Sequence, residues 1–250
     1  RIFPIISARG VAVYSTIPNQ SYLPMDGTSM ACPTVTGHLA LLTQRWKQLH
    51  GNANPYNYFL KALIANTATD AGNPGPDYKF GFGVLDGAAA INAMEKEWYQ
   101  LDQLVRSETQ KELTLNVPAG VKELRVMLCW NDPVANRVYK TGDLPLVNDL
   151  DLKIVHNGNE YFPYSLDYKN PDANAVSVAK NAVDNIEQIV IPNPSSGSYT
   201  VSVTGVVKQG AQQPYAVVWY FDEQHPTLAA PLAGEIYAPG ENVYIRTQHF

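Results

Sequence analysis

Ser29 is the residue of this sequence that is best placed to do chemistry. It follows the pair Gly27-Thr28 at the start of a long run in which apolar residues recur every three or four positions. A serine at the N-terminus of a helix lies beside free backbone N–H groups and the positive end of the helix dipole, and both stabilise a developing oxyanion. This position suits a nucleophilic serine. The alternative is a Thr or Ser that only caps the helix, which is far commoner for an isolated Thr-Ser pair before a helix.

A second group of residues has the chemistry of a cation site. Asp149 and Asp151 are two positions apart on a predicted strand, so both carboxylates leave the same face, about 6.5–7 Å apart. Hard oxygen ligands of this kind suit calcium. The same side chains also close Asx turns at strand ends or lie on a solvated strand face, and they then bind no metal. Further oxygen ligands could come from Asp132, Asn148, Asn181, Asp184 and Asn185.

Three helices are expected in the first hundred residues to position the serine. The first covers residues 28–50, where the apolar spacing is helical. The second follows Asn54-Pro55, which is typical of a capping residue with proline at the first helical position, and it ends near residue 67. The third begins at a capping Asp86 and runs towards residue 98. Between the second and third helices lies a loop rich in Gly, Pro, Asn and Asp. This part of the chain is interpreted as α/β.

From about residue 113 the hydrophobic pattern changes to a period of two, which is typical of strands with one buried face. The pair Asn157-Gly158 favours a tight hairpin. Short strands separated by turn residues indicate a β-sandwich. The predicted strands cover residues 113–117, 124–130, 150–154, 199–203 and 215–221, and weaker strand patterns lie at 235–237 and 242–245.

Composition excludes several classes of protein. The 250 residues carry a formal net charge of −5, so the chain is not a nucleic-acid binder held by bulk charge. No apolar run approaches the roughly 18 residues that a membrane span needs, and a charged fraction of only 16% suits an exported protein. Cys32 and Cys129 form no Cys-x-x-Cys pair, which excludes zinc and redox sites. Two buried free thiols are favoured over one disulfide.

Several segments, in order along the chain, resemble the subtilisin-like serine proteases, or subtilases. Residues 27–33, Gly-Thr-Ser-Met-Ala-Cys-Pro, are similar to the nucleophile motif of that family. Residues 8–16, 62–68 and 81–89 look like segments that flank this motif. Two departures are present: Arg9 stands where proline is usual, and residues 34–36 read Thr-Val-Thr in place of His-Val-Ala.

The β-rich half has a resemblance of its own. Residues 130–133, 146–152 and 181–188 resemble the jelly-roll domain that follows the catalytic domain in some secreted subtilases, and related jelly rolls bind calcium. The resemblances imply an α/β fold, the C-terminal part of a doubly wound catalytic domain, followed by an all-β jelly roll. The expected domains are residues 1–100, residues 101–224, and a linker with the start of a further β module at 225–250.

The resemblance implies a secreted, cell-surface or periplasmic serine endopeptidase that hydrolyses polypeptides through an acyl-enzyme on Ser29. The Ser29 N–H would help to hold the oxyanion. In subtilisin the catalytic order along the chain is Asp, His, Ser, so both partners should precede the serine. Only one acidic residue does, Asp26, which is better interpreted as a turn residue. His38 lies nine residues along the helix, about 13.5 Å of rise beyond hydrogen-bond reach.

We therefore expect the triad Asp and His, and the side-chain donor of the oxyanion hole, to lie outside this chain. The chain would be a piece of a longer protein, inactive by itself, with the N-terminal catalytic region as its partner. The expected metal is structural Ca²⁺ with Asp149, Asp151 and Asp184 among its ligands, and no organic cofactor is expected. Cys32 is interpreted as a core residue, and His50, His156, His225 and His249 as surface residues.

Two other functions remain open at this point. In the first, the chain is a catalytically silent pseudoprotease fragment whose sandwich binds protein or glycan. In the second, it is a serine-carboxyl peptidase, which also places a Gly-Thr-Ser turn before a helix but works with carboxylates at acid pH. Met30-Ala31 followed by Pro33, together with the sandwich, disfavours the second.

Overall fold

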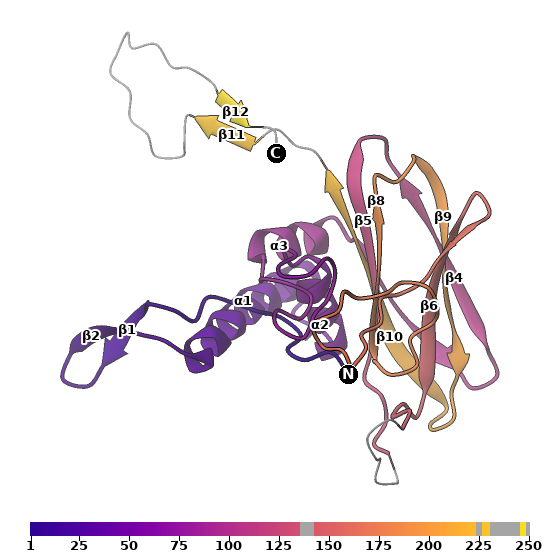
Figure 1. The fold of residues 1–250 in the computed structure, drawn as a ribbon, viewed down its shortest axis with the longest axis horizontal. Coiled ribbons are helices and arrows are strands. Elements are labelled where there is room, and N and C mark those ends of the chain that lie inside the picture. Colours follow the sequence, from indigo (N-terminus) through magenta and orange to yellow (C-terminus); the bar gives the residue numbers. More distant parts are fainter. Residues whose placement is uncertain (136–142, 224–226, 231–245, 249–250) are drawn as a thin grey trace.

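The computed structural model describes residues 1–135, 143–223, 227–230 and 246–248. In this part of the chain a layer of helices lies against one face of an antiparallel β-sandwich (Figure 1). The helices are α1 (Thr28–Leu49), α2 (Asn57–Asn66) and α3 (Gly87–Glu95).

The predicted helices are confirmed, with one wrong start and one wrong end. The first matches its prediction to within a residue. The second begins two residues later than proline at its first position would require, because Pro55 precedes the extended capping residue Tyr56. The third is capped as predicted, since Asp86 Oδ1 accepts a hydrogen bond from the Ala89 N–H at 2.9 Å. It ends at Glu95, and Glu97, with a φ of 53°, turns the chain away.

A β-hairpin that the sequence did not predict leads into α1. It consists of β1 (Val13–Ile17) and β2 (Ser21–Met25), paired antiparallel. The turn contains Asn19 and Gln20, both with positive φ, a conformation that asparagine tolerates better than most residues. The hairpin projects away from the sandwich together with the start of α1 (Figure 1).

The sandwich consists of two four-stranded antiparallel sheets, and all five predicted strands lie within it. The hairpin at Asn157-Gly158 is also confirmed, with positive φ at both residues. The helix-facing sheet has the order β3 (Tyr99–Val105), β10 (Gln212–Glu223), β5 (Val121–Trp130), β8 (Ile186–Pro192). The outer sheet has the order β4 (Gln110–Val117), β9 (Gly197–Val206), β6 (Asp149–His156), β7 (Asn159–Tyr161).

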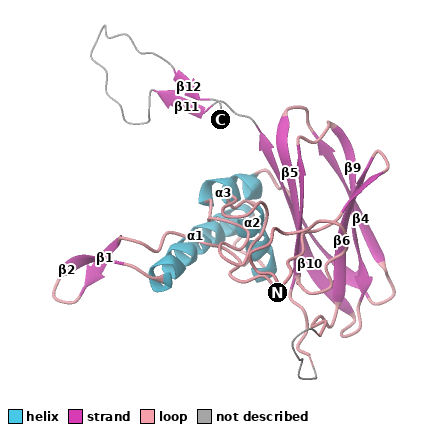
Figure 2. Cartoon of the chain, in the orientation of Figure 1, coloured by secondary structure: helices cyan, strands magenta, loops and turns pink. Residues whose placement is uncertain are grey.

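Two clusters of buried side chains hold these layers together. One fills the sandwich, with Trp130, Tyr199 and Tyr215 among its largest members. The other joins the helices to the helix-facing sheet, where Phe59 of α2 belongs to the same buried cluster as Val218 of β10. Figure 2 shows the helices on that one face of the strands. The sheet is therefore buried on both faces, which agrees with the nearly continuous burial of β5 and β10.

The fold-class prediction is correct in part. The sandwich and the helices are present, but the described residues contain no parallel sheet of the doubly wound kind, only one isolated parallel bridge, Ser7 to Val84. A parallel sheet needs several strand–helix–strand units, and residues 1–100 supply helices and a single hairpin. Near the C-terminus β11 (Thr227–Ala230) pairs with β12 (Arg246–Gln248). The strand patterns at 235–237 and 242–245 lie outside the described residues.

Within the part of the chain that the structure describes, no helix combines the length and the apolar character needed to cross a membrane.

Candidate active site

Ser29 lies in the first turn of α1, exposed to solvent, as its sequence position predicts. The helix starts after Gly27, whose φ of 143° is a backbone conformation that residues with a side chain rarely adopt. No side chain caps the helix, so the simple capping role considered for Thr28 or Ser29 does not apply. The Ser29 N–H belongs to the first-turn donors that have no partner within the helix.

Two hydrogen bonds fix the turn that carries Ser29. The Gly27 N–H donates to the Gly10 carbonyl at 2.7 Å, and the Ala12 N–H donates to Asp26 Oδ1 at 2.6 Å. Asp26 therefore supports the turn, the role that the sequence favoured. Position 10 must be glycine here, because a Cβ would lie 2.7 Å from the Gly27 carbonyl oxygen. The segment before the hairpin and the serine turn thus hold each other in place.

Pro33 lies inside α1, beyond the first turn in which the missing N–H of a proline costs little. In a helix that begins at Thr28, the N–H of residue 33 would pair with the Ser29 carbonyl, so that carbonyl loses its helical donor. The Thr34 hydroxyl donates to the neighbouring Met30 carbonyl at 3.2 Å.

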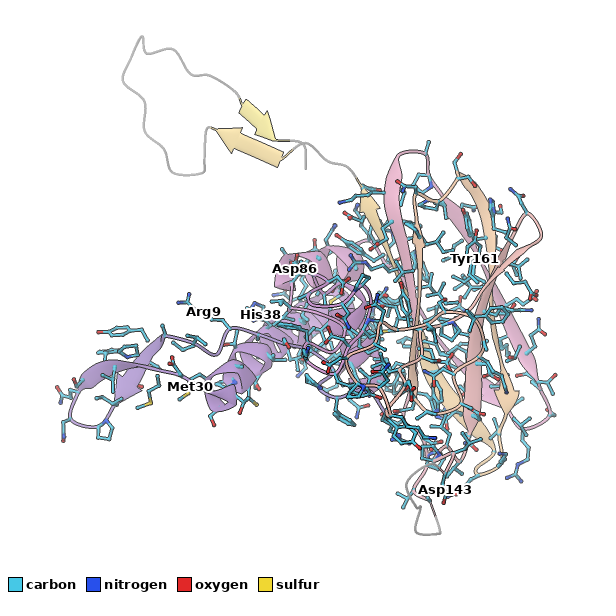
Figure 3. The ribbon with its side chains drawn as sticks, viewed as in Figure 1. Arg9, Met30, His38, Asp86, Asp143 and Tyr161 are labelled. Atoms are coloured by element: carbon cyan, nitrogen blue, oxygen red, sulfur yellow. The ribbon has the colours of Figure 1, made fainter. Side chains whose placement is uncertain are left out.

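His38 has a structural role and does not face the serine. Its Nδ1 lies 2.8 Å from the Thr34 carbonyl oxygen, and its ring packs against Gly87 so closely that a Cβ there would be 2.3 Å from His38 Cδ2. Figure 3 shows His38 well along α1 from Met30, which marks the N-terminal end of the helix. Within the described residues the Ser29 hydroxyl has no hydrogen-bond partner. The turn therefore holds Ser29 in position, but no described residue is hydrogen-bonded to its hydroxyl as a general base.

Large apolar side chains of the hairpin and of α1 face solvent. Tyr14 and Tyr22 of the hairpin stack on each other with ring centroids 5.5 Å apart, and both are mostly exposed. Of the 22 residues of α1, only Leu42 and Trp46 are buried. Exposed apolar side chains gathered on a hairpin and a helix are typical of a protein–protein interaction surface. The other exposed members are Val11, Leu23, Met25 and Leu41.

The predicted cation ligands fall into two groups. Asp149 and Asp151 lie on β6 with one carboxylate oxygen each, Oδ1, buried and without a partner among the described residues. Glu187 of β8, which sequence reasoning missed, has the same kind of orphan oxygen, Oε1. Its Oε2 accepts a hydrogen bond from the Leu152 N–H at 2.7 Å. Leu152 belongs to the part of β6 that does not pair with β7, because β7 pairs only with residues 154–156. Packing of the two sheets thus brings three carboxylates into one region.

The pKa values of these carboxyls reflect their burial. Burial raises the pKa of Asp149, and the neighbouring charge of Asp151 raises it further. Burial also raises the pKa of Asp151, although Lys180, at 3.2 Å from its Oδ2, opposes this. The pKa of Glu187 is raised well above its ordinary value, first by burial and then by the acidic neighbours. The ammonium of Lys180 offsets part of this charge, and protons or a bound cation would offset more.

Asp184 differs from these three carboxylates because both of its oxygens accept hydrogen bonds. Its Oδ1 accepts from the Ile2 N–H at 2.9 Å and its Oδ2 from Asn181 Nδ2 at 3.0 Å, so both oxygens are used. The remaining candidates close loops in the same way: Asp132 accepts from the backbone of residues 147 and 148, Asn148 joins three segments, and Asn185 donates to the Trp130 carbonyl. Among the described residues no group of three or more His, Cys, Asp or Glu is arranged to hold a metal ion. The calcium site stays a prediction.

Both cysteines are free thiols, as predicted. The expectation that Cys32 is buried is wrong, because the face of α1 that carries it is open. His156 is likewise not a surface residue: it is buried, and its ring stacks on Tyr199 at 3.8 Å. His50 is half-buried against Trp46. His225 and His249 lie outside the described residues.

Parts of the chain are similar to known serine proteases. The model of the subtilase family matches residues 1–83. Over 85 residues the chain is 39% identical to alkaline elastase YaB of Bacillus sp. (strain YaB), covering 34% of this chain and 20% of that protein. Over 105 residues it is 35% identical to an extracellular serine protease of Serratia marcescens, covering 40% and 10%. A serine protease/ABC transporter B family protein of Dictyostelium discoideum is 24% identical over 257 residues, covering 86% and 14%.

Solved structures give only a weak overall likeness. The serine protease of Aeromonas sobria aligns with a TM-score of 0.25 and 14% identity, covering 80% of this chain and 45% of that one. The chain spans 10–20% of the length of the three curated relatives named above. Residues 1–83 nevertheless carry the serine turn within a matched family segment. Residues 1–83 of the chain are therefore similar to the subtilase family of serine proteases.

Proposed function

We propose that this chain belongs to a secreted subtilisin-like serine endopeptidase, in which Ser29 is the nucleophile. The observation that carries the proposal is the seating of Ser29 in the first turn of α1. There two hydrogen bonds fix the turn: the Gly27 N–H donates to the Gly10 carbonyl, and the Asp26 carboxylate accepts from the Ala12 N–H. The same residues fall inside the segment that matches the subtilase model.

The proposed reaction follows from the position of Ser29 in the first turn of α1. Ser29 Oγ attacks the carbonyl carbon of a peptide bond, and its proton passes to a histidine supplied by another part of the protein. The negative charge on the carbonyl oxygen is then stabilised by the Ser29 N–H at the start of α1. The C–N bond breaks as the amine leaves with the proton, giving an ester on Ser29. Water, deprotonated by the same base, hydrolyses that ester.

Partners and location follow as parts of the same proposal. The exposed apolar face of the hairpin and α1 supports docking of the region that carries the Asp and His, and a polypeptide is the substrate. A charged fraction of 16% and the Serratia marcescens relative, described as extracellular, support a location outside the cell, at its surface or in the periplasm.

We also interpret the sandwich as a jelly roll, with the division at residues 1–100, 101–224 and 225–250 retained as a proposal. Strand order supports this, because the first strand of the sandwich, β3, pairs with its last, β10, and the second, β4, with its next-to-last, β9. For the metal we propose Ca²⁺, which would draw together Asp149, Asp151 and Glu187: their buried orphan oxygens are hard ligands, although the described residues are not arranged to hold a metal ion without it. When bound, it would neutralise the clustered negative charge.

Active-site labelling tests the function. The 250-residue chain and a longer protein that includes the preceding region are treated with a fluorophosphonate probe, and the adduct is located by mass spectrometry. We expect labelling of the longer protein at Ser29, none in its Ser29→Ala variant, and full labelling in the control Ser21→Ala, an exposed serine of β2. A longer protein that folds but stays unlabelled favours the silent binding fragment. Labelling that is maximal at acid pH favours the serine-carboxyl peptidase.

A further inference from the structure

A groove of about 410 Å³ lies where the start of α2 meets the end of the helix-facing sheet. Tyr56 and Tyr58 line it on the helix side, and Gln103 of β3 and Gln212 of β10 line it on the sheet side. Its volume is in the range of small-molecule sites. The serine turn lies elsewhere, since the start of α1 projects away from the sandwich (Figure 1). The groove has no part in the proposed protease chemistry.

The two tyrosines form a flat aromatic surface in this groove. Their ring centroids are 5.2 Å apart and their planes differ by 13°, so the rings are stacked. Tyr58 is only 7% exposed and anchors the pair, whereas Tyr56 is 56% exposed. Because one face of Tyr56 is occupied by Tyr58, the other is available to a ligand. An exposed tyrosine held by a buried one costs little conformational entropy on binding.

The polar groups of the groove include two glutamine amides and one carboxylate. The side-chain amides of Gln103 and Gln212 have no hydrogen-bond partner among the described residues, so both donors and acceptors are available. Asp102 also lines the groove, but its carboxylate is already used. Its Oδ1 accepts from the Gln103 N–H at 2.8 Å and its Oδ2 from Gln100 Nε2 at 3.3 Å. An anionic ligand would find no counter-charge among these lining residues, whereas neutral hydroxyl groups can bond to the two glutamine amides.

We propose that this groove binds a neutral oligosaccharide. A pyranose ring presents C–H groups on its faces and hydroxyls around its rim. The faces pack on Tyr56, and the hydroxyls exchange hydrogen bonds with the two glutamine amides. An extended peptide is the competing occupant, but it would need apolar side-chain pockets, and the lining offers only Leu101 and Pro214 beside the tyrosines. The groove would hold the protein on a saccharide-bearing surface or on a glycosylated substrate.

A glycan array tests the proposal on the 250-residue chain. The array carries neutral β-glucan, mannan and chito-oligosaccharides together with the neutral glycans of glycoproteins, which separates the two sources. The best binder is then titrated by calorimetry against three proteins: the parent chain, Tyr56→Ala and Tyr168→Ala. Tyr168 is a matched control, being 55% exposed and outside the groove. We expect Tyr56→Ala to weaken binding about tenfold and Tyr168→Ala to leave it within twofold.

The proposal is overturned if no saccharide binds above background, or if both variants bind equally well. Binding of an unglycosylated peptide that competes at Tyr56 would reassign the groove to a peptide. Because Tyr56 is exposed, its truncation should leave the thermal midpoint unchanged, and Gln212→Ala provides a second test on the sheet side. These outcomes are independent of fluorophosphonate labelling at Ser29, so failure here does not bear on the protease proposal.

Discussion

The two thiols should differ in reactivity, because Cys129 is buried and Cys32 is exposed. Cys129 is fully buried in β5, and that burial raises the pKa of its thiol to about 11, although Lys61 acts slightly against it. Cys32 is exposed. At pH 8 only Cys32 should react with Ellman's reagent, giving one thiol per native chain and two per unfolded chain. A Cys32→Ser variant should show no native thiol. Rapid native reaction of Cys129 in that variant would contradict the packing of β5.

Asp77 gives the molecule a pH dependence on the acid side. It is 2% exposed, and its carboxylate accepts three backbone N–H groups, from Asn73, Lys79 and Phe80. Burial alone would raise the pKa of Asp77, but these hydrogen bonds outweigh it and the pKa is lowered. The folded pKa thus lies below the unfolded one. The ionised carboxylate contributes stability above the unfolded pKa of about 3.9 and loses it as the pH falls through the folded value.

Asp77→Asn should therefore reduce the free energy of unfolding by about 2 kcal/mol at pH 7, with the deficit shrinking below about pH 4. Urea unfolding at several pH values measures this. Asp172→Asn is the control, because that carboxylate pairs with Lys79 at the surface and should matter little. A deficit for Asp77→Asn that stayed constant from pH 7 to pH 3 would exclude the ionised carboxylate as its source.

The carboxylates of Asp149, Asp151 and Glu187 predict a response to calcium. Added Ca²⁺ should raise the thermal midpoint of the chain, and EDTA should return it to the metal-free value. Glu187→Gln keeps an acceptor for the Leu152 N–H but loses a charge, so it should abolish the calcium response. Glu160→Gln removes an exposed carboxylate paired with Lys153 and is the control. A midpoint indifferent to Ca²⁺ and EDTA in the parent chain would end the calcium proposal.

The capping of α3 is a test at the scale of one element. This helix is nine residues long, so it depends on its ends and on tertiary packing. Asp86→Ala removes the acceptor of the Ala89 N–H and should cost about 1 kcal/mol in the free energy of unfolding. Asp86→Asn keeps a capping oxygen and should restore most of that loss. Equal losses for both variants would mean that the carboxylate acts otherwise than as a cap.

Local signals explain which elements the sequence predicts. The Gly-Thr-Ser turn, the long α1 and the hairpin at Asn157-Gly158 depend on residues close together in the chain, and the structure has all three. The strand β3 was missed because its residues follow the helical run of α3 without a strong turn signal, so the helix was extended towards residue 98. A positive φ at Glu97, which propensity does not reveal, makes that turn.

Sites built by packing are not visible in the same way. Glu187 sits within an apolar strand, and only the approach of β8 to β6 makes it a neighbour of Asp149 and Asp151. The groove brings together Tyr56 and Gln212, which lie far apart in the sequence. Asp184 was chosen because it lies near two asparagines in sequence, but the structure uses it to hold the Ile2 N–H. Long-range juxtaposition therefore decides both sites, and no spacing rule predicts it.

At the scale of the whole molecule, α2 joins the helical layer to the sandwich. Its last residue, Asn66, is fully buried. Asn66 Nδ2 donates to the Val218 carbonyl at 3.0 Å, and its Oδ1 accepts from Gln188 Nε2 at 3.1 Å. These bonds reach two strands of the helix-facing sheet within a shared hydrophobic core. The physical consequence is that helices and sandwich should open together, because neither can expose its face of this core without exposing the other.

Asn66→Ala tests that coupling. It leaves buried partners without a hydrogen bond and should lower the free energy of unfolding by about 2–3 kcal/mol. Native-state hydrogen exchange, resolved by mass spectrometry, should show the same loss of protection in peptides from α2 and from β5. Asn92→Ala, at an exposed position of α3, should change neither. If exchange accelerated in α2 while β5 kept its full protection, the helical layer would be a separate cooperative unit. The sandwich would then fold without support from the protease-like part.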